Sequence, residues 1–226
     1  MAIAAESAPT RVVVESTPAA ADPAPLGLAA FALTTFMISG HNATFIPDLI
    51  WVGLALFYGG MAQLLAGMWE FRNRNVFGAT AFSTYGGFWM SLGIFVVLAV
   101  VSKSFGGALE GANLPNAIAW FMIAFAIFNT YMLLWSTQVN VAVFLVFATL
   151  EVTEVLLAVG NFQQAHGNAT PYIVHLAGWV GIATAACAWY ASAAGVINGM
   201  KGTAILPVGA PLHLGNGMTH RRHQHA

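Results

Sequence analysis

The sequence predicts an all-α membrane protein, built as one domain of six transmembrane helices in a lipid bilayer. Apolar residues make up 58% of the 226 residues and charged residues only 7%, whereas a soluble domain carries about 25% charged residues. The apolar residues gather into six runs, and a run of about 20 residues crosses the hydrocarbon core as a helix. Because the runs are continuous and do not alternate with polar residues, they indicate helices rather than barrel strands.

The order of the elements follows from these runs. We expect helices at about residues 26–40, 49–69, 79–101, 118–134, 139–159 and 172–197. The chain then divides into a tail at 1–21, a transmembrane domain at 22–200 and a cytoplasmic tail at 201–226. The first tail is rich in Ala, Pro and Ser, and we expect it to be disordered. Its acidic residues outnumber its one arginine, which is the wrong charge balance for a signal peptide.

The basic residues predict the orientation of the bundle. With the N-terminus inside, six of the seven basic residues are cytoplasmic: Arg11, Arg72, Arg74, Lys201, Arg221 and Arg222. Lys103 alone falls outside, and such a bias is what the positive-inside rule describes. The sequence therefore predicts a multi-pass protein of the plasma (inner) membrane with both termini in the cytoplasm.

The remaining composition excludes several classes of function. The net charge is −1, and no basic cluster suggests a nucleic-acid partner. Cys187 is the sole cysteine, so neither an internal disulfide nor a thiolate metal site is expected. We see no nucleophile and base in a credible setting for catalysis. We therefore expect no enzyme activity, no metal and no cofactor.

Two glutamates lie in the middle of the fifth apolar run. An ionised carboxylate at that depth costs at least about 2–3 kcal/mol, so Glu151 and Glu154 must face the bundle interior, a subunit interface or a wet cavity. They are candidates for a proton relay or a cation site, or else they form a polar helix contact as neutral acids. His175, near the start of the sixth run, is a third relay candidate, or it donates to a backbone carbonyl. A di-metal site would need Glu-x-x-His pairs, which are absent.

The first span offers a candidate aqueous path. Asp22 is suited to cap a helix that starts at Pro23, and the free amides of that helix would form a weak anion site at the cytoplasmic mouth. The alternative is a plain helix cap. A stripe at helical spacing follows, and it either lines a narrow path or packs inside the bundle: Phe31, Thr34, Thr35, Ile38 and Asn42.

The second span carries small residues on one face. Gly59, Gln63 and Gly67 recur every four residues there, and small residues let helices approach closely. Gln63 is the exception in this stripe, because a buried amide needs partners.

Several motifs together resemble one family, the acetate uptake transporters, which include bacterial succinate–acetate permeases and fungal acetate transporters. The first resembles the family signature Asn-Pro-Ala-Pro-Leu-Gly-Leu, with Asp22 in place of Asn: Asp22-Pro23-Ala24-Pro25-Leu26-Gly27-Leu28. The later ones are Phe57-Tyr58-Gly59-Gly60, Tyr85-Gly86-Gly87-Phe88-Trp89 and His175-Leu176-Ala177-Gly178-Trp179. The similarity covers about residues 22–208, and the motifs occur in the family's order.

This resemblance implies six-helix protomers that assemble as a homo-hexamer, and it implies that each protomer has its own pore. Glycine faces such as those of Gly59 and Gly67 would then pack between protomers. The resemblance also implies that Phe31, Tyr85 and Leu150 form the pore constriction. The substrate-binding candidates are Asp22, Ala24, Leu26, Thr34, Thr35, Asn42 and Gln63. The Tyr85 hydroxyl would hydrogen-bond the passing acid. The two glutamates depart from the family pattern.

The favoured function is membrane transport of acetate and similar small monocarboxylates through a narrow pore. Succinate is a further candidate substrate, and a proton is a candidate co-substrate. Acetate resembles an acidic side chain, with a pKa of roughly 4 to 5, so it is an anion at neutral pH. An inside-negative potential opposes its entry by about 2.3 kcal/mol per 100 mV. The alternatives are a cation or proton channel that uses Glu151 and Glu154, and an acetate sensor that transports nothing.

Overall fold

The computed structural model describes residues 20–108, 110, 113–167 and 172–212, and every regular element within them is a helix. The elements are α1 (Ala24–Asn42), α2 (Ile50–Leu56), the π-helix η1 (Phe57–Ala62), α3 (Gln63–Arg72), α4 (Val76–Val101), α5 (Lys103–Ala108), α6 (Asn113–Ser136), α7 (Val141–Ala165) and α8 (Tyr172–Lys201). Because α2, η1 and α3 continue one another, they make one span. The described residues thus contain six apolar helices of 19 to 30 residues, which confirms the predicted number of spans.

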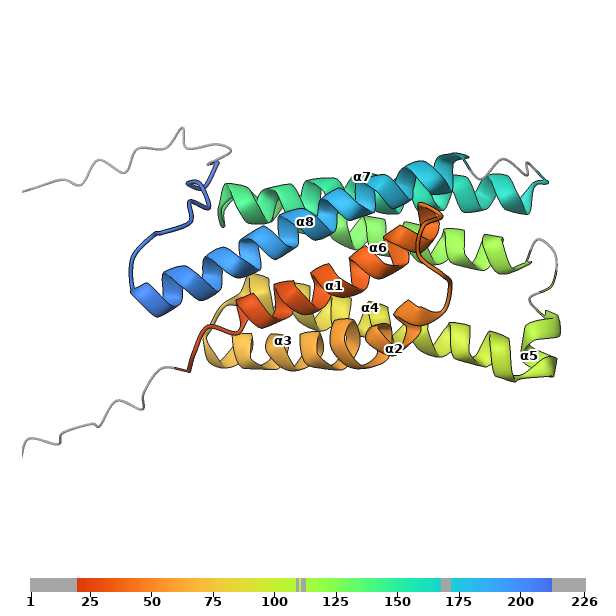
Figure 1. The fold of residues 1–226 in the computed structure, drawn as a ribbon, viewed down its shortest axis with the longest axis horizontal. Helices are drawn as coiled ribbons and strands as arrows, with labels where there is room; N and C mark the ends of the chain where they lie inside the picture. The colour runs from red at the N-terminus through yellow and green to blue at the C-terminus, as the bar shows by residue number, and fades with distance from the viewer. Residues whose placement is uncertain (1–19, 109, 111–112, 168–171, 213–226) are drawn as a thin grey trace, which may run out of the picture.

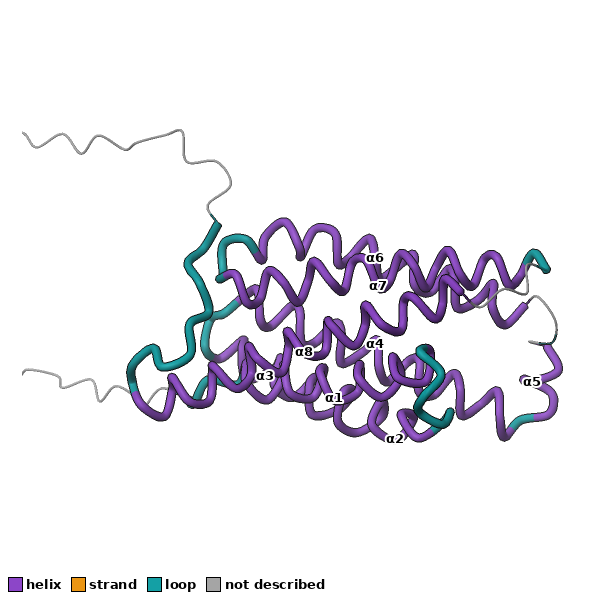
Figure 2. The backbone as a smooth tube through the Cα atoms, turned by 45° about the horizontal axis from the view of Figure 1, so that its top comes forward, coloured by secondary structure: helices purple, strands orange, loops and turns teal. Residues whose placement is uncertain are grey.

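The helices lie roughly along one common direction (Figure 1). Helix α8 packs along α1, α7 packs between α6 and α8, and α3 packs on α4. Both ends of the described chain, residues 20 and 212, lie at the same end of the bundle, on the left of Figures 1 and 2. The turns from α3 to α4 and from α6 to α7 also lie there, whereas α5 lies at the opposite end. Arg72, Arg74 and Lys201 therefore share one end and Lys103 the other, as the orientation prediction requires.

The first helix begins one residue later than the sequence suggested. Pro23 occupies the N-cap position and the helix begins at Ala24, not at Pro23. Asp22 still contributes, because its Oδ1 accepts a hydrogen bond of 2.9 Å from the Ala24 amide. This carboxylate takes up one of the free amide groups that an anion at the helix start would need.

The glycines of the second span are buried against helices of the same chain. A Cβ on Gly59 would lie 2.8 Å from Thr34 Cβ on α1, and a Cβ on Gly67 would lie 2.6 Å from the Ser83 amide on α4. The expectation that these two glycines pack between protomers was wrong, since both faces are already occupied. Gly59 lies within the π-helix η1 and Gly67 on α3, and the wider turn of the π-helix changes which neighbour the span faces between the two positions.

The chain after α8 returns to the bundle. The Leu212 amide donates to the Thr137 carbonyl at 2.7 Å, and the Ala142 amide donates to the Val208 carbonyl at 2.9 Å. The Tyr190 hydroxyl donates to the Pro207 carbonyl. The first part of the predicted tail at 201–226 is therefore held against α7 and α8. The predicted disordered tail at 1–21 lies almost entirely outside the described residues, as does the chain from residue 213 onward.

We predict that Gly178→Ala destabilises the fold. A Cβ at this position would lie 2.5 Å from the Ala43 amide nitrogen and 2.7 Å from the Ser39 carbonyl oxygen. Backbone atoms cannot swing aside, so the overpacking should cost about 1–3 kcal/mol. Thermal unfolding in detergent measures this cost. The matched control is Gly87→Ala, because nothing lies within 4 Å of a Cβ there; equal effects of the two changes would contradict the close α1–α8 contact.

Candidate functional site

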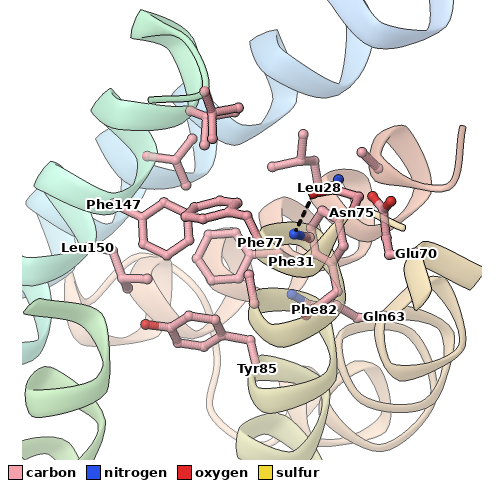
Figure 3. Close-up of a pocket in the computed structure, with 16 residues that line it drawn as sticks. Leu28, Phe31, Gln63, Glu70, Asn75, Phe77, Phe82, Tyr85, Phe147 and Leu150 are labelled. Carbon is pink, nitrogen blue, oxygen red and sulfur yellow. Dashed lines mark hydrogen bonds between the residues drawn. The ribbon is translucent and has the colours of Figure 1, made fainter. Parts of the chain in front are cut away.

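Three side chains from three helices meet in the middle of the bundle. Phe31 on α1, Tyr85 on α4 and Leu150 on α7 are each exposed by 7% or less. The Phe31 and Tyr85 rings pack edge to face with their centroids 5.8 Å apart. We call these three residues the waist, and Figure 3 shows them grouped at one side of a cavity. The structure thus brings together the three residues that the resemblance assigned to a constriction.

The waist lies between two cavities, because the same three residues line both of them. The inner cavity, of about 80 Å³, lies toward the end of the bundle that holds residues 20 and 212. It is lined by Ala24, Leu28, Phe31, Gln63, Glu70, Asn75, Phe77, Gly78, Ala81, Phe82, Tyr85, Val139, Val143, Val146, Phe147 and Leu150. Its walls are mostly apolar, and its polar side chains gather near α3 and the start of α4 (Figure 3).

The outer cavity, of about 40 Å³, lies on the other side of the waist. It is lined by Phe31, Thr35, Ile38, Ser39, Asn42, Tyr85, Phe88, Trp89, Leu92, Met122, Leu150, Thr153, Glu154 and Leu157. Both cavities are large enough to hold water. Together they mark a route along the inside of one protomer, interrupted where the waist closes it.

Unpartnered polar atoms concentrate around these two cavities. Within the described residues, six buried side-chain atoms lack a hydrogen-bond partner, and five of them belong to cavity-lining residues. The outer cavity has Thr35 Oγ1, Trp89 Nε1 and Glu154 Oε2, and the inner cavity has Gln63 Oε1 and Glu70 Oε1. Buried polar groups in proteins are nearly always hydrogen-bonded. Water or a polar solute in either cavity would satisfy these atoms.

A network of polar side chains backs the waist. Asn129 on α6 is completely buried, and its amide nitrogen donates to the Phe147 carbonyl at 3.0 Å and to Glu151 Oε2 at 2.7 Å. The Tyr85 hydroxyl donates to Asn129 Oδ1 at 2.8 Å and lies 3.4 Å from Glu154 Oε1. The network thus connects Glu151, which is half-buried beside Thr130, to Glu154, which is 2% exposed.

This arrangement changes the role expected for Tyr85. The Asn129 nitrogen faces two acceptors, so its oxygen must face the tyrosine, and the tyrosine proton is used in that bond. In the conformation described, the Tyr85 hydroxyl is therefore bonded within the protein, and its hydrogen bond to the passing acid stays a prediction. The bond to Asn129 fixes the ring that forms one side of the waist.

The other candidate residues separate into groups. Ala24 and Gln63 line the inner cavity, and Thr35 and Asn42 line the outer one. The rest lie outside both cavities: Asp22 and Leu26 are exposed near the start of α1, Thr34 packs against Gly59 and donates to the Ala30 carbonyl, and His175 lies 3.1 Å from the Ala43 carbonyl. The structure does not bring His175 to the glutamates.

Sequence reasoning missed two residues of the site. Glu70 stands beside Arg72 and Arg74 in the sequence and was not singled out, yet it is 1% exposed. Asn129 was not singled out, although an amide inside an apolar span needs partners as much as Gln63 does. Among the described residues, no group of histidine, cysteine and acidic side chains could hold a metal ion.

Comparisons with known proteins agree with a membrane transport path. A family described as the GPR1/FUN34/yaaH family matches residues 5–211. Acetate permease A of Emericella nidulans is 40% identical over 198 residues, which cover 83% of this chain and 65% of that protein. The succinate-acetate/proton symporter SatP of Escherichia coli K12 is 36% identical over 84% of this chain and 95% of its own length. The solved structure of the bacterial acetate channel SatP aligns with a TM-score of 0.75 and 34% identity, over 84% of this chain and 99% of that one.

We predict that Tyr85 and Asn129 stabilise the fold as a pair. Asn129→Leu should cost about 1–3 kcal/mol because it removes the acceptor of the 2.8 Å Tyr85 bond and the donor to Glu151 Oε2. In that variant, Tyr85→Phe should cost less than it costs in the unmodified protein, since the bond between the two residues has already been lost. Thermal unfolding of both single variants and the double variant in detergent measures this coupling. Tyr172→Phe, at an exposed tyrosine, is the control, and additive effects of Tyr85→Phe and Asn129→Leu would argue against the network.

Proposed function

Because this chain belongs to the GPR1/FUN34/yaaH family, we propose that it moves acetate and similar small monocarboxylates across a membrane, with succinate as a further substrate. The observation that carries this proposal is the waist, since three buried side chains separate two cavities that follow one route through the protomer. The two SatP comparisons, one named for succinate and acetate and one for acetate alone, support the choice of substrate. The chain spans 65% of the length of the fungal relative above, so that protein's activity supports the proposed function but does not establish it.

The chemistry of the route suits a small acid with one apolar end. Phe31 and Leu150 offer a methyl group an apolar wall, and the carboxyl group needs polar partners on either side. Gln63 in the inner cavity and Thr35 with Trp89 in the outer cavity have unpartnered atoms at the places where the acid would pause. A narrow waist would pass a two-carbon acid and slow larger ones.

The proposal includes a location and an assembly. The chain is a multi-pass membrane protein, and we place it in the plasma (inner) membrane with both termini in the cytoplasm, where the end that holds Arg72, Arg74 and Lys201 would face. We further propose a homo-hexamer in which every protomer keeps its own path.

We predict that the waist sets the size of the acid. In liposomes that contain the purified protein, Phe31→Ala and Leu150→Ala should raise uptake of labelled lactate relative to acetate by about threefold or more, because each removes a buried side chain from the waist. Leu134→Ala, at an exposed leucine on α6, should leave the ratio unchanged.

An unchanged ratio in both waist variants would place the selective step elsewhere. Binding of acetate without any uptake by the unmodified protein would instead identify an acetate sensor.

Proton conduction is a second candidate function, and the polar network behind the waist favours it. The Tyr85 proton is used in the 2.8 Å bond to Asn129, so a proton between Tyr85 and Glu154 has to come from the Glu154 carboxyl. Glu151, Asn129, Tyr85 and Glu154 then form a hydrogen-bonded chain between a half-buried acid and the outer cavity. A proton that followed this chain would enter the Asn129 amide at its oxygen and leave from its nitrogen, with the amide passing through its imidic acid form. His175 has no part in this relay because its ring bonds the Ala43 carbonyl.

Proton flux in the absence of any carboxylic acid tests this candidate. If the relay conducts protons, a dye-loaded liposome should acidify under a pH gradient, and Glu154→Gln should lower the rate at least tenfold. Glu110→Gln, an exposed acid outside both cavities, is the control. Proton flux that persists in Glu154→Gln, or is absent from the unmodified protein, would remove this function.

A further inference from the structure

Glu70 is a buried acid at the inner end of the proposed path. It lies in the last turn of α3, is 1% exposed and lines the inner cavity with an unpartnered Oε1. Gln63 lies two turns earlier on the same helix, is 2% exposed and has an unpartnered Oε1 in the same cavity. Figure 3 shows both side chains coming from one side of the cavity, opposite Phe147 and Leu150.

The start of α4 is shaped to keep this carboxyl in place. A Cβ on Gly78 would lie 2.7 Å from Glu70 Oε1 and 2.6 Å from Asn75 Nδ2. Only a residue without a side chain therefore leaves room for the acid and the amide together. Asn75 is held in turn, because its Oδ1 accepts from the Gly78 amide at 3.1 Å as the cap of α4.

No described basic side chain compensates a charge on Glu70. The ion pair of the described residues joins His41 to Asp48 at 3.5 Å, and it lies around the turn between α1 and α2 rather than on α3. The titratable neighbour whose charge acts on Glu70 is Asp22, which is also acidic, while Arg72 and Arg74 are exposed. Apart from Tyr85, whose hydroxyl is bonded to Asn129, the side chains that α1, α4 and α7 contribute to the walls are apolar: Ala24, Leu28, Phe31, Phe77, Ala81, Phe82, Val143, Val146, Phe147 and Leu150.

The protonation state of Glu70 determines whether it repels or binds a carboxylate in this cavity. An ionised Glu70 would have the Asn75 amide beside it but no positive charge to compensate it, which is costly inside a membrane. It would also repel an anion that enters the same small cavity. A protonated Glu70 has the opposite effect, because its O–H can donate to the anion. The Gln63 amide can turn its nitrogen toward the second carboxylate oxygen, since its oxygen has no partner to hold it.

We propose that Glu70 carries the proton that crosses together with each small carboxylate, and that Gln63 orients the acid during the exchange. The proton passes from the Glu70 carboxyl to an oxygen of the bound carboxylate, which leaves through the waist as the neutral acid. Glu70 then regains a proton from water at the inner end of the cavity. The two acids have similar intrinsic pKa values, so the exchange runs in both directions. This inference rests on the proposed function and assigns its coupling to one residue.

Electrical measurements separate a coupled proton from a free anion. An acid that crosses with one proton carries no net charge, so the unmodified protein should exchange labelled acetate in liposomes but show no acetate current in a planar bilayer. Glu70→Gln keeps the shape of the side chain and cannot carry the proton. Its acetate should cross as an anion, with a current that reverses near 60 mV for a tenfold acetate gradient.

Two further variants complete the test. Glu70→Asp keeps an acid and should stay electrically silent with acetate exchange within about threefold of the unmodified protein. Glu110→Gln makes the same chemical change at an exposed acid and should change neither readout. Glu70→Gln could instead lose acetate exchange altogether while it still elutes as a folded protein. In that case, acetate exchange by Glu70→Asp supports the proposal, and absence of exchange by Glu70→Asp overturns it.

Other results overturn the proposal directly. An acetate current through the unmodified protein would show that the anion crosses without a proton, and a silent, fully active Glu70→Gln would show that the proton uses another group. Exchange that stops when sodium and potassium are replaced by choline would identify a metal cation at Glu70. In each of these cases acetate still crosses, so the proposed function survives; it fails only if the unmodified protein moves no acetate.

Discussion

A polar group inside a bilayer has to find its partner within the protein, and this constraint organises the whole bundle. The six helices satisfy their own backbone groups, and Asn129 satisfies the buried Tyr85 hydroxyl and one oxygen of Glu151. Most of the buried polar atoms left without partners line the two cavities. The polar atoms that have no hydrogen-bond partner within the protein are therefore the atoms that a passing solute would meet. The need to pair buried polar groups thus explains both the fold and the path.

The number and position of the spans could be predicted from the sequence, because length and apolar composition determine them. The details that depend on neighbouring helices could not. Helical spacing put Thr34 and Thr35 on one stripe, yet Thr34 packs against Gly59 while Thr35 faces the outer cavity. Adjacent residues on a helix point about 100° apart, and only the position of the neighbouring helices decides which of the two faces the path.

The waist residues could be predicted from the sequence, whereas two other residues of the site could not. Phe31, Tyr85 and Leu150 came from a resemblance, and the structure places them together from three helices. Glu70 was missed because charges at a helix end beside arginines usually face water. Its burial depends on the start of α4, where Gly78 leaves room for the carboxyl and the capping Asn75. The partner of Tyr85 was missed for a similar reason, since Asn129 lies 44 residues farther along the chain.

The central claim is that one route runs inside each protomer, from the inner cavity past the waist to the outer cavity. A crystal structure with bromoacetate, whose bromine can be located by anomalous scattering, tests this most directly. Bromine peaks are expected in the inner cavity near Gln63 and Glu70 and in the outer cavity near Thr35 and Trp89, with none between protomers. Bromine confined to an axis shared by several protomers, with both cavities free of it, would contradict the account.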